Sequence, residues 1–161
     1  VEVKSTHIPD VKIVVCESFS DHRGVFVRHW DRDAWTDAGI GPFVQDNVSV
    51  SSEGVLRGLH FQGVDPQGKL VSVLSGSIYD VAVDIRPDSS TNGQWVGVHL
   101  RAGEHRQLWV PPGFAHGFCS LSKEVVLHYK CSKYRNANSE TGILLIIFWI
   151  ISVQFLFIKE T

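Results

Sequence analysis

Apolar and polar residues alternate in short runs along most of the chain, and glycine or proline residues separate the runs. Alternation with a period of two is typical of a half-buried β-strand. The pattern predicts strands over residues 11–19, 25–28, 43–50, 55–62, 70–74, 77–85, 95–100, 107–110, 118–121 and 125–130. Only residues 31–38 read as a helix, because an aspartate stands at their start and Gly39 follows them. Many short strands between turn residues predict an all-β, antiparallel sandwich or barrel with little helix.

The chain reads as a single domain over residues 1–161, since no internal repeat, linker or low-complexity tract divides it. Its last part, residues 144–161, is an atypical apolar tail in which Ser152 and Gln154 interrupt a long hydrophobic run. The run is shorter than the ~20 residues that a membrane-spanning helix needs. Three interpretations stay open: a buried pair of strands, a tail anchor, or a tail that is not the natural sequence at this point.

Composition narrows the class of protein. The chain has 161 residues, of which 43% are hydrophobic, and its net charge of −2 argues against an electrostatic nucleic-acid binder. Cys16, Cys119 and Cys131 are odd in number and show no C-x-x-C spacing, so we expect no disulfide framework and no zinc site. With no secretory signal pattern at the start, we expect a reducing, cytoplasmic location.

The stretch 55–62 offers the first candidate chemistry, because it carries Arg57 and His60 on either side of Gly58. Histidine accepts protons near neutral pH, and arginine holds a fixed positive charge. Strict strand alternation would place the two side chains on opposite faces. A shared site therefore requires a kink or bulge near Gly58. The alternative is a core histidine beside a surface arginine.

Polar residues on neighbouring predicted strands are further candidates. Gln45 and Asn47 lie two apart, so their side chains share a strand face. Lys69 begins one strand, and Asp80 and Asp84 share a face of the next. A buried lysine or aspartate is costly unless it is paired or used. The alternative is that these are turn and edge charges that face water.

Two more residues occur near the end of the chain. The turn at residues 111–113 leads into a strand that carries His116. Tyr129 lies in the last predicted strand, where it is either a proton donor or an aromatic packing residue.

Taken together, these motifs resemble the dTDP-4-dehydrorhamnose 3,5-epimerase family. The resemblance covers residues 11–143 and rests on motifs in the family's order, at residues 21–26, 43–47, 55–62, 68–71, 80–86, 111–118 and 129–132. It implies a cupin-like antiparallel jelly roll that acts as a homodimer on a dTDP-4-keto-6-deoxyhexose, in rhamnose-type deoxysugar biosynthesis. It also implies that neither a metal nor another cofactor takes part.

The resemblance assigns a role to each catalytic candidate. His60 matches the family's proton acceptor, which removes the proton alpha to the ketone. Lys69 matches a cationic group near the developing enolate oxygen. Asp80 matches a carboxylate close to that lysine. Tyr129 matches the donor that returns a proton to the opposite face of the sugar.

The remaining matches are to substrate-binding positions. Arginines at two positions match contacts to the diphosphate, and the other residues match contacts to the nucleotide or sugar. These residues are Arg23, Phe26, Gln45, Asn47, Arg57, His116 and Glu140.

The chain departs from the family pattern at two places. Arg28 stands where the family usually has a substrate-contacting glutamate, which reverses a charge. After Ile143 the family usually continues to an aspartate that orients the catalytic histidine, whereas residues 144–161 contain no aspartate. A frame-shifted or truncated gene would give such a change, so the hypothesis is an epimerase fold whose activity is weakened or lost.

Other functions stay open. The nearest is a monofunctional 3- or 5-epimerase, or a ketoisomerase, on nucleotide sugars. A metal-dependent cupin is less favoured, because residues 60–62 offer one metal ligand where three or more are usual. A third class is a non-catalytic binding protein, including one tethered to a membrane by the apolar tail.

Overall fold

The computed structural model describes residues 1–143, which form strands and one short helix. The helix is α1 (Arg32–Asp37). The strands are β1 (Glu2–Ser5), β2 (Lys12–Val15), β3 (Glu17–Asp21), β4 (Gly24–Arg28), β5 (Gln45–Ser52), β6 (Leu56–Gln62), β7 (Lys69–Ser75), β8 (Ser77–Asp84), β9 (Trp95–Arg101), β10 (Arg106–Val110), β11 (Phe114–Ser120), β12 (Glu124–Cys131) and β13 (Glu140–Gly142).

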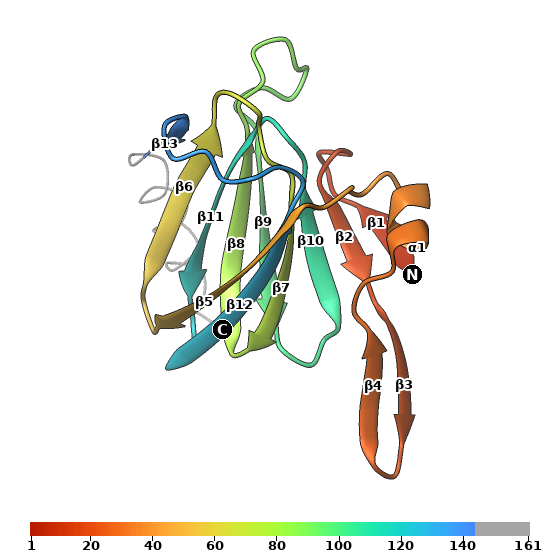
Figure 1. Cartoon of the computed structure of the whole chain (residues 1–161). Coiled ribbons are helices and arrows are strands. Elements are labelled where there is room, and N and C mark those ends of the chain that lie inside the picture. Colours follow the sequence, from red (N-terminus) through yellow and green to blue (C-terminus); the bar gives the residue numbers. More distant parts are fainter. Residues whose placement is uncertain (144–161) are drawn as a thin grey trace.

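Two antiparallel sheets form the body, and a hairpin projects from it (Figure 1). The six-stranded sheet has the order β1-β2-β10-β7-β12-β5, and the five-stranded sheet has the order β13-β6-β11-β8-β9. The hairpin consists of β3 and β4. The predicted all-β, antiparallel fold with little helix is confirmed.

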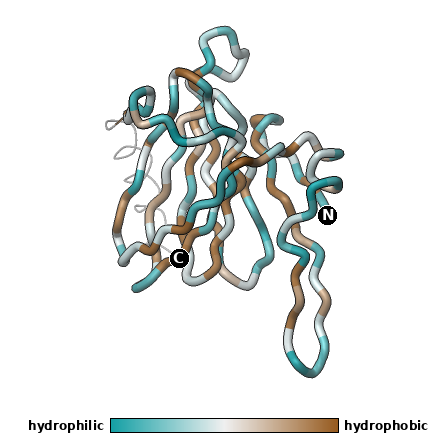
Figure 2. The backbone as a smooth tube through the Cα atoms, in the orientation of Figure 1, coloured by the Kyte–Doolittle hydropathy of each residue, from teal (hydrophilic) through white to brown (hydrophobic). Residues whose placement is uncertain are grey.

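The main hydrophobic core lies between the two sheets. Buried side chains from both sheets meet there, including Val71, Ile78, Leu108 and Leu127. Figure 2 shows this as hydrophobic stretches along the central strands, with hydrophilic residues at most loop tips. Alternate residues of β8 face the other way and join a second cluster with Leu59 and Ala115. Strand alternation thus buries both faces of β8.

The helix forms as predicted. The side chain of Asp31 accepts hydrogen bonds from the backbone N–H groups of Asp33 and Ala34, as an N-cap does. Gly39 follows the helix with a φ of 73°, a left-handed conformation that favours glycine. Trp35, the buried residue of α1, packs against the outer face of the six-stranded sheet with Ile40 and Trp109.

The predicted strand over residues 11–19 is two strands in the structure. The chain breaks at Cys16, whose backbone N–H donates to the carbonyl of His105 at 2.8 Å. Strand β2 then belongs to the six-stranded sheet and β3 to the hairpin. Strands β1 and β13 were not predicted, because each has only three or four residues and no clear alternation.

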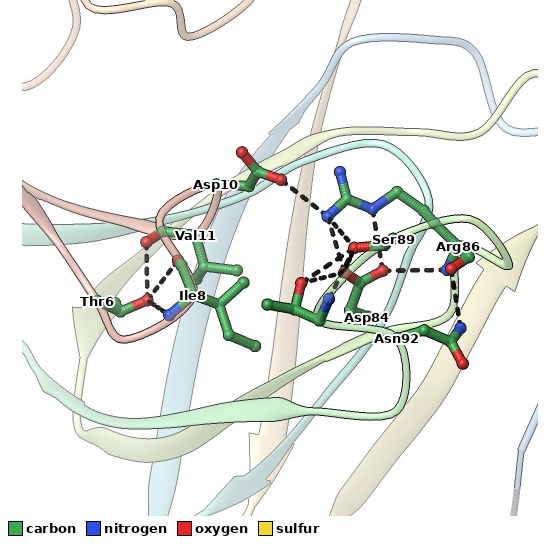
Figure 3. A network of polar contacts seen from close by, with 9 residues as sticks. Thr6, Ile8, Asp10, Val11, Asp84, Arg86, Ser89 and Asn92 are labelled. Carbon is green, nitrogen blue, oxygen red and sulfur yellow. Dashed lines mark hydrogen bonds and ion pairs between the residues drawn. The ribbon is translucent and has the colours of Figure 1, made fainter.

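Asp84 and Asp80 are both fully buried, so the interpretation of edge charges facing water is wrong for this strand. Asp84 accepts hydrogen bonds from Arg86, Ser89 and Thr91, as Figure 3 shows in part. The Arg86 guanidinium holds the pKa of this carboxyl well below its usual range. Arg86 also pairs with Asp10 at 2.8 Å, which ties the loop after β8 to the turn before β2.

Candidate active site

A pocket of about 220 Å³ opens between the two sheets. One wall comes from β6 and β11 of the five-stranded sheet, and the facing wall comes from β5, β7 and β12 of the six-stranded sheet. Its lining is rich in polar and charged side chains. The lining residues are Asn47, Ser49, Arg57, His60, Gln67, Lys69, His116, Gly117, Phe118, Leu127, Tyr129, Arg135 and Glu140.

Strand β6 is bulged between Arg57 and His60. In the pairing with β11, His60 lies opposite His116 and Arg57 lies opposite Phe118, so β6 carries one extra residue over this interval. Gly58 has a φ of 123°, and a Cβ atom there would lie 2.5 Å from the Cα atom of Gly117. The bulge predicted near Gly58 is confirmed, and it turns both Arg57 and His60 toward the pocket.

The imidazole of His60 lies on one wall of the pocket in an environment that disfavours protonation. Burial lowers its pKa, and the positive charges of Lys69 and Arg135 lower it further. The carboxylate of Glu140 acts in the opposite direction. The result is an imidazole that is neutral at neutral pH and available as a base.

Tyr129 and Lys69 lie on the facing wall, on β12 and β7. Burial raises the pKa of the Tyr129 phenol, so the phenol keeps its proton at neutral pH. Burial lowers the pKa of Lys69, while the nearby Cys131, Glu140 and Asp80 oppose that shift. The pocket therefore has a base on one sheet, and a proton donor beside a lysine on the other.

Asp80 lies behind the pocket and does not line it. Its Oδ1 atom is 2.8 Å from Nε2 of His116 on the neighbouring strand β11. The family resemblance implied that Asp80 lies close to Lys69, and its charge does favour the protonated form of that lysine. The direct partner of Asp80, however, is His116.

Hydrogen bonds to side chains of β5 hold the predicted binding residues of β5 and β6. Arg57 donates from Nε to the hydroxyl of Ser51 at 2.9 Å. Gln45 donates from Nε2 to Oδ1 of Asn47 at 2.8 Å, which confirms that the two share a face. Asn47 lines the pocket, whereas Gln45 does not.

Arg135 is a pocket residue that the sequence did not suggest. It lies in the segment 132–139 between β12 and β13, which has no periodic pattern. Its Nε atom donates to Oε2 of Glu140 at 2.6 Å, and both side chains line the pocket. Glu140 was predicted, but its pairing with an arginine five residues earlier could be seen only in the structure.

The hairpin that carries Arg23 and Phe26 projects from the body (Figure 1), and neither residue lines the pocket. Arg23 pairs with Asp21 at 2.6 Å, and Phe26 is 70% exposed beside Phe19. Arg28, at the base of the hairpin, pairs with Glu17 at 2.7 Å. Within one chain, the structure does not bring these predicted binding residues to the others.

Comparisons with known proteins agree with this geometry. Residues 5–146 match the sequence profile of the dTDP-4-dehydrorhamnose 3,5-epimerase family. The chain is 50% identical over 147 residues to the enzyme of that name from Shigella flexneri, covering 88% of this chain and 80% of the relative. The chain belongs to the dTDP-4-dehydrorhamnose 3,5-epimerase family.

Solved structures support the same family and fold. A dTDP-6-deoxy-D-glucose-3,5-epimerase from Legionella pneumophila, in complex with dTDP-4-keto-L-rhamnose, is 47% identical with a TM-score of 0.87, and the match covers 90% of this chain and 78% of that one. The predicted family and cupin-like fold are thus confirmed. The named relatives are isomerases, as the resemblance implied.

Other relatives differ in length or in named activity. The chain spans 43% of the length of a dTDP-4-dehydrorhamnose 3,5-epimerase from Neisseria gonorrhoeae, with 48% identity over 86% of this chain. It is also 38% identical to a dTDP-4-dehydrorhamnose 3-epimerase from Streptomyces niveus, over 79% of this chain and 63% of that relative. The family therefore includes relatives named for one inverted centre as well as for two.

Several expectations concern features beyond this pocket. Within residues 1–143, no group of three or more histidine, cysteine, aspartate or glutamate side chains is arranged to hold a metal ion. The same part of the chain contains no helix of the length and hydrophobicity that crossing a bilayer requires. The predictions for the apolar tail and for the missing histidine-orienting aspartate fall on residues 144–161, outside the described residues.

Proposed function

We propose that this chain epimerises a dTDP-4-keto-6-deoxyhexose at C3 and C5, as a single-domain dTDP-4-dehydrorhamnose 3,5-epimerase in rhamnose-type deoxysugar biosynthesis. The observation that carries the proposal is the placement of His60 and Tyr129 on opposite walls of one pocket. A group that removes a proton from one face and a group that returns one to the other face are what inversion of a carbon centre needs.

The reaction proceeds through an enolate. Neutral His60 removes the proton on the carbon alpha to the C4 ketone, and the electron pair of that C–H bond delocalises onto the ketone oxygen. The ammonium of Lys69 stabilises the negative charge on this oxygen. Tyr129 then protonates the same carbon from the opposite face, and solvent restores the phenol proton and takes the proton from His60. Electrons and protons balance without an added oxidant or reductant.

Substrate binding uses the positive side chains around the pocket. Arg57 and Arg135 supply guanidinium groups suited to the diphosphate. His116, fixed by Asp80, and the amide of Asn47 supply hydrogen-bonding groups for the sugar and nucleotide. Glu140 completes the binding set near His60.

The substrate class rests on two supports. The pocket combines guanidinium groups with an acid–base pair, and the Legionella pneumophila relative was solved with a dTDP-linked keto sugar. To test the function, the protein is incubated with dTDP-4-keto-6-deoxyglucose in deuterium oxide and followed by proton NMR. Loss of both the C3 and C5 proton signals, with appearance of the dTDP-4-keto-rhamnose product, is the expected result.

The closest alternative is epimerisation at C3 or C5 alone, and the Streptomyces niveus relative named as a 3-epimerase supports it. The same NMR experiment separates the two. Deuterium at only one of the two carbons would show that the protein epimerises one centre and not both. Loss of neither signal would contradict both.

We also propose that the protein is a homodimer in which the hairpin reaches the partner. The hairpin exposes Phe19, Val25 and Phe26 at 50%, 54% and 70%. Figure 2 shows that its strands are partly hydrophobic while its turn is hydrophilic. An exposed apolar strand pair is typical of an interaction site. A partner's pocket would then receive Arg23 and Phe26, which stand outside the pocket of their own chain.

Sedimentation at micromolar concentration tests the dimer. The native protein should sediment as a dimer, and Phe26→Asp should shift it toward the monomer and weaken substrate binding. A native protein that stays monomeric would contradict the proposal.

A reducing, cytoplasmic location fits the three buried cysteines, none of which is paired.

A further inference from the structure

One buried amide connects three separate parts of the chain at the end of the pocket. Gln62 ends β6, two residues after His60, and its side chain is only 6% exposed. Its Nε2 atom donates to the carbonyl oxygens of Asp65 at 3.0 Å and Tyr134 at 3.4 Å. Its Oε1 atom accepts from the backbone N–H of Asn136 at 2.8 Å. Both donors and the acceptor of this amide are therefore satisfied by backbone groups.

The segment held in this way carries Arg135 to the pocket. A second glutamine binds the same segment from the other sheet. Oε1 of Gln45 accepts a hydrogen bond from the backbone N–H of Arg135 at 3.1 Å. Backbone groups of residues 134, 135 and 136 are thus bonded to side chains of β5 and β6. From this fixed backbone, the Arg135 side chain reaches Glu140, and the pair lines the pocket beside His60.

Other bonds attach the ends of the segment but not its centre. Gln67 donates to the carbonyl of Lys133 at 2.8 Å, and the backbone N–H of Gly63 donates to the carbonyl of Ser139 at 3.2 Å. Without the Gln62 amide, the segment would stay tethered at both ends while its middle lost two of its three side-chain anchors. The carbonyl of Tyr134 and the N–H of Asn136 would lose their partner, so the backbone on either side of Arg135 would be less restrained.

We propose that Gln62 is a positioning residue, whose buried amide fixes the Arg135–Glu140 pair at the wall of the pocket. The proposal rests on the proposed function, because the pair matters to turnover only if this pocket binds the substrate. Gln62 itself does not line the 220 Å³ pocket, so it acts through the residues it holds.

A double-mutant cycle tests the proposal. Gln62→Leu removes all three bonds at similar volume and should lower kcat/KM about tenfold, since small misplacements of binding groups are costly. In an Arg135→Ala background the same change should lower kcat/KM less than about twofold, because the group it positions is gone. An equal loss in both backgrounds, or an Arg135→Ala variant with unchanged kcat/KM, would overturn the proposal.

The control variant is Val98→Ala, which trims a buried side chain of β9 in the main core. It should lower the melting temperature, yet leave kcat/KM unchanged below that temperature. If Gln62→Leu does not fold, Gln62→Glu replaces it, because it keeps the acceptor for Asn136 and loses both donors. The same prediction applies to that variant.

A spectroscopic readout separates this proposal from the proposed function. The Nε–H of Arg135 donates to Glu140 at 2.6 Å, so its proton NMR signal should lie downfield of that of an unpaired arginine in the native protein and in Val98→Ala. Gln62→Leu should return the signal toward the unpaired position. An unchanged signal would overturn the positioning role. A native protein with the downfield signal but no turnover would instead contradict the proposed function alone.

Discussion

Asp80 and His116 are diagonal neighbours on the paired strands β8 and β11, with 2.8 Å between Asp80 Oδ1 and His116 Nε2. Asp80 has no exposed surface, so its carboxylate depends on this partner. The Nε2–H group donates to the carboxylate, which leaves Nδ1 of His116 as the other ring nitrogen to act in the pocket. The pair therefore fixes the orientation and tautomer of a predicted binding residue.

Asp80→Asn should lower kcat/KM by at least about tenfold with a smaller loss in melting temperature, because an amide of the same shape no longer selects one imidazole tautomer. Steady-state kinetics and thermal unfolding measure the two effects. His116→Ala serves as the comparison, and adding Asp80→Asn to it should cause little further loss in kcat/KM. Full additivity of the two changes would show that they act independently.

Glu140→Gln should move the acid limb of the kcat/KM profile to lower pH. The base must be neutral to act, and the Glu140 charge raises the pKa of His60 against the lowering effect of burial. Removing that charge lowers the pKa further, so His60 stays neutral to a lower pH. Rate measurements between about pH 5 and 8 locate the midpoint. A midpoint that stays in place or moves up would contradict this account of the charge balance.

The folded protein should lose stability in mild acid because of two buried histidines, His29 and His128. Their ring centroids are 5.8 Å apart, and His29 Nε2 and His128 Nδ1 are buried without a hydrogen-bond partner in the described chain. Burial lowers the pKa of both histidines. The charges of His128 and Lys130 lower the pKa of His29 further. Asp46 raises the pKa of His128 and so opposes the effect of burial there. The unfolded chain then binds more protons, so stability is present above about pH 6.5 and falls as the pH drops below that value.

Chemical denaturation between about pH 7 and 5 tests this prediction. His128→Gln should flatten the decline, whereas His22→Gln, at the exposed tip of the hairpin, should leave it unchanged. A decline of the same slope in all three proteins would assign the pH dependence to other groups.

Gly58→Ala should destabilise the fold by about 2–5 kcal/mol, because the added Cβ meets the backbone of β11 and the residue has a positive φ. Gly93→Ala is the matched control, since Gly93 also has a positive φ but has nothing within 4 Å of the added Cβ. Gly93→Ala should lower the free energy of unfolding by about 1–2 kcal/mol. Equal losses in the two variants would mean that the close approach of β6 to β11 is not needed.

Local pattern was sufficient for most strands and for part of the site. Alternation in β9 and the turn residues around it are visible in the sequence, and the bulge at Gly58 follows from requiring Arg57 and His60 to share a site. The Asp80–His116 pair was not visible, because the two residues are 36 positions apart in the sequence and meet only through the alignment of β8 with β11. Arg135 was missed for a similar reason, since long-range bonds, among them those from β5 and β6, place its irregular segment.

Inversion through an enolate is tested most directly by separating proton removal from proton return. Native protein, His60→Ala and Tyr129→Phe are each incubated with dTDP-4-keto-6-deoxyglucose in deuterium oxide, and both exchange and inversion are followed by NMR. The native protein should exchange the substrate protons for deuterium and invert the carbon centres, and His60→Ala should do neither. Tyr129→Phe should still exchange the substrate protons for deuterium, while its rate of inversion falls sharply. Exchange in His60→Ala at the native rate would contradict the assignment of His60 as the base.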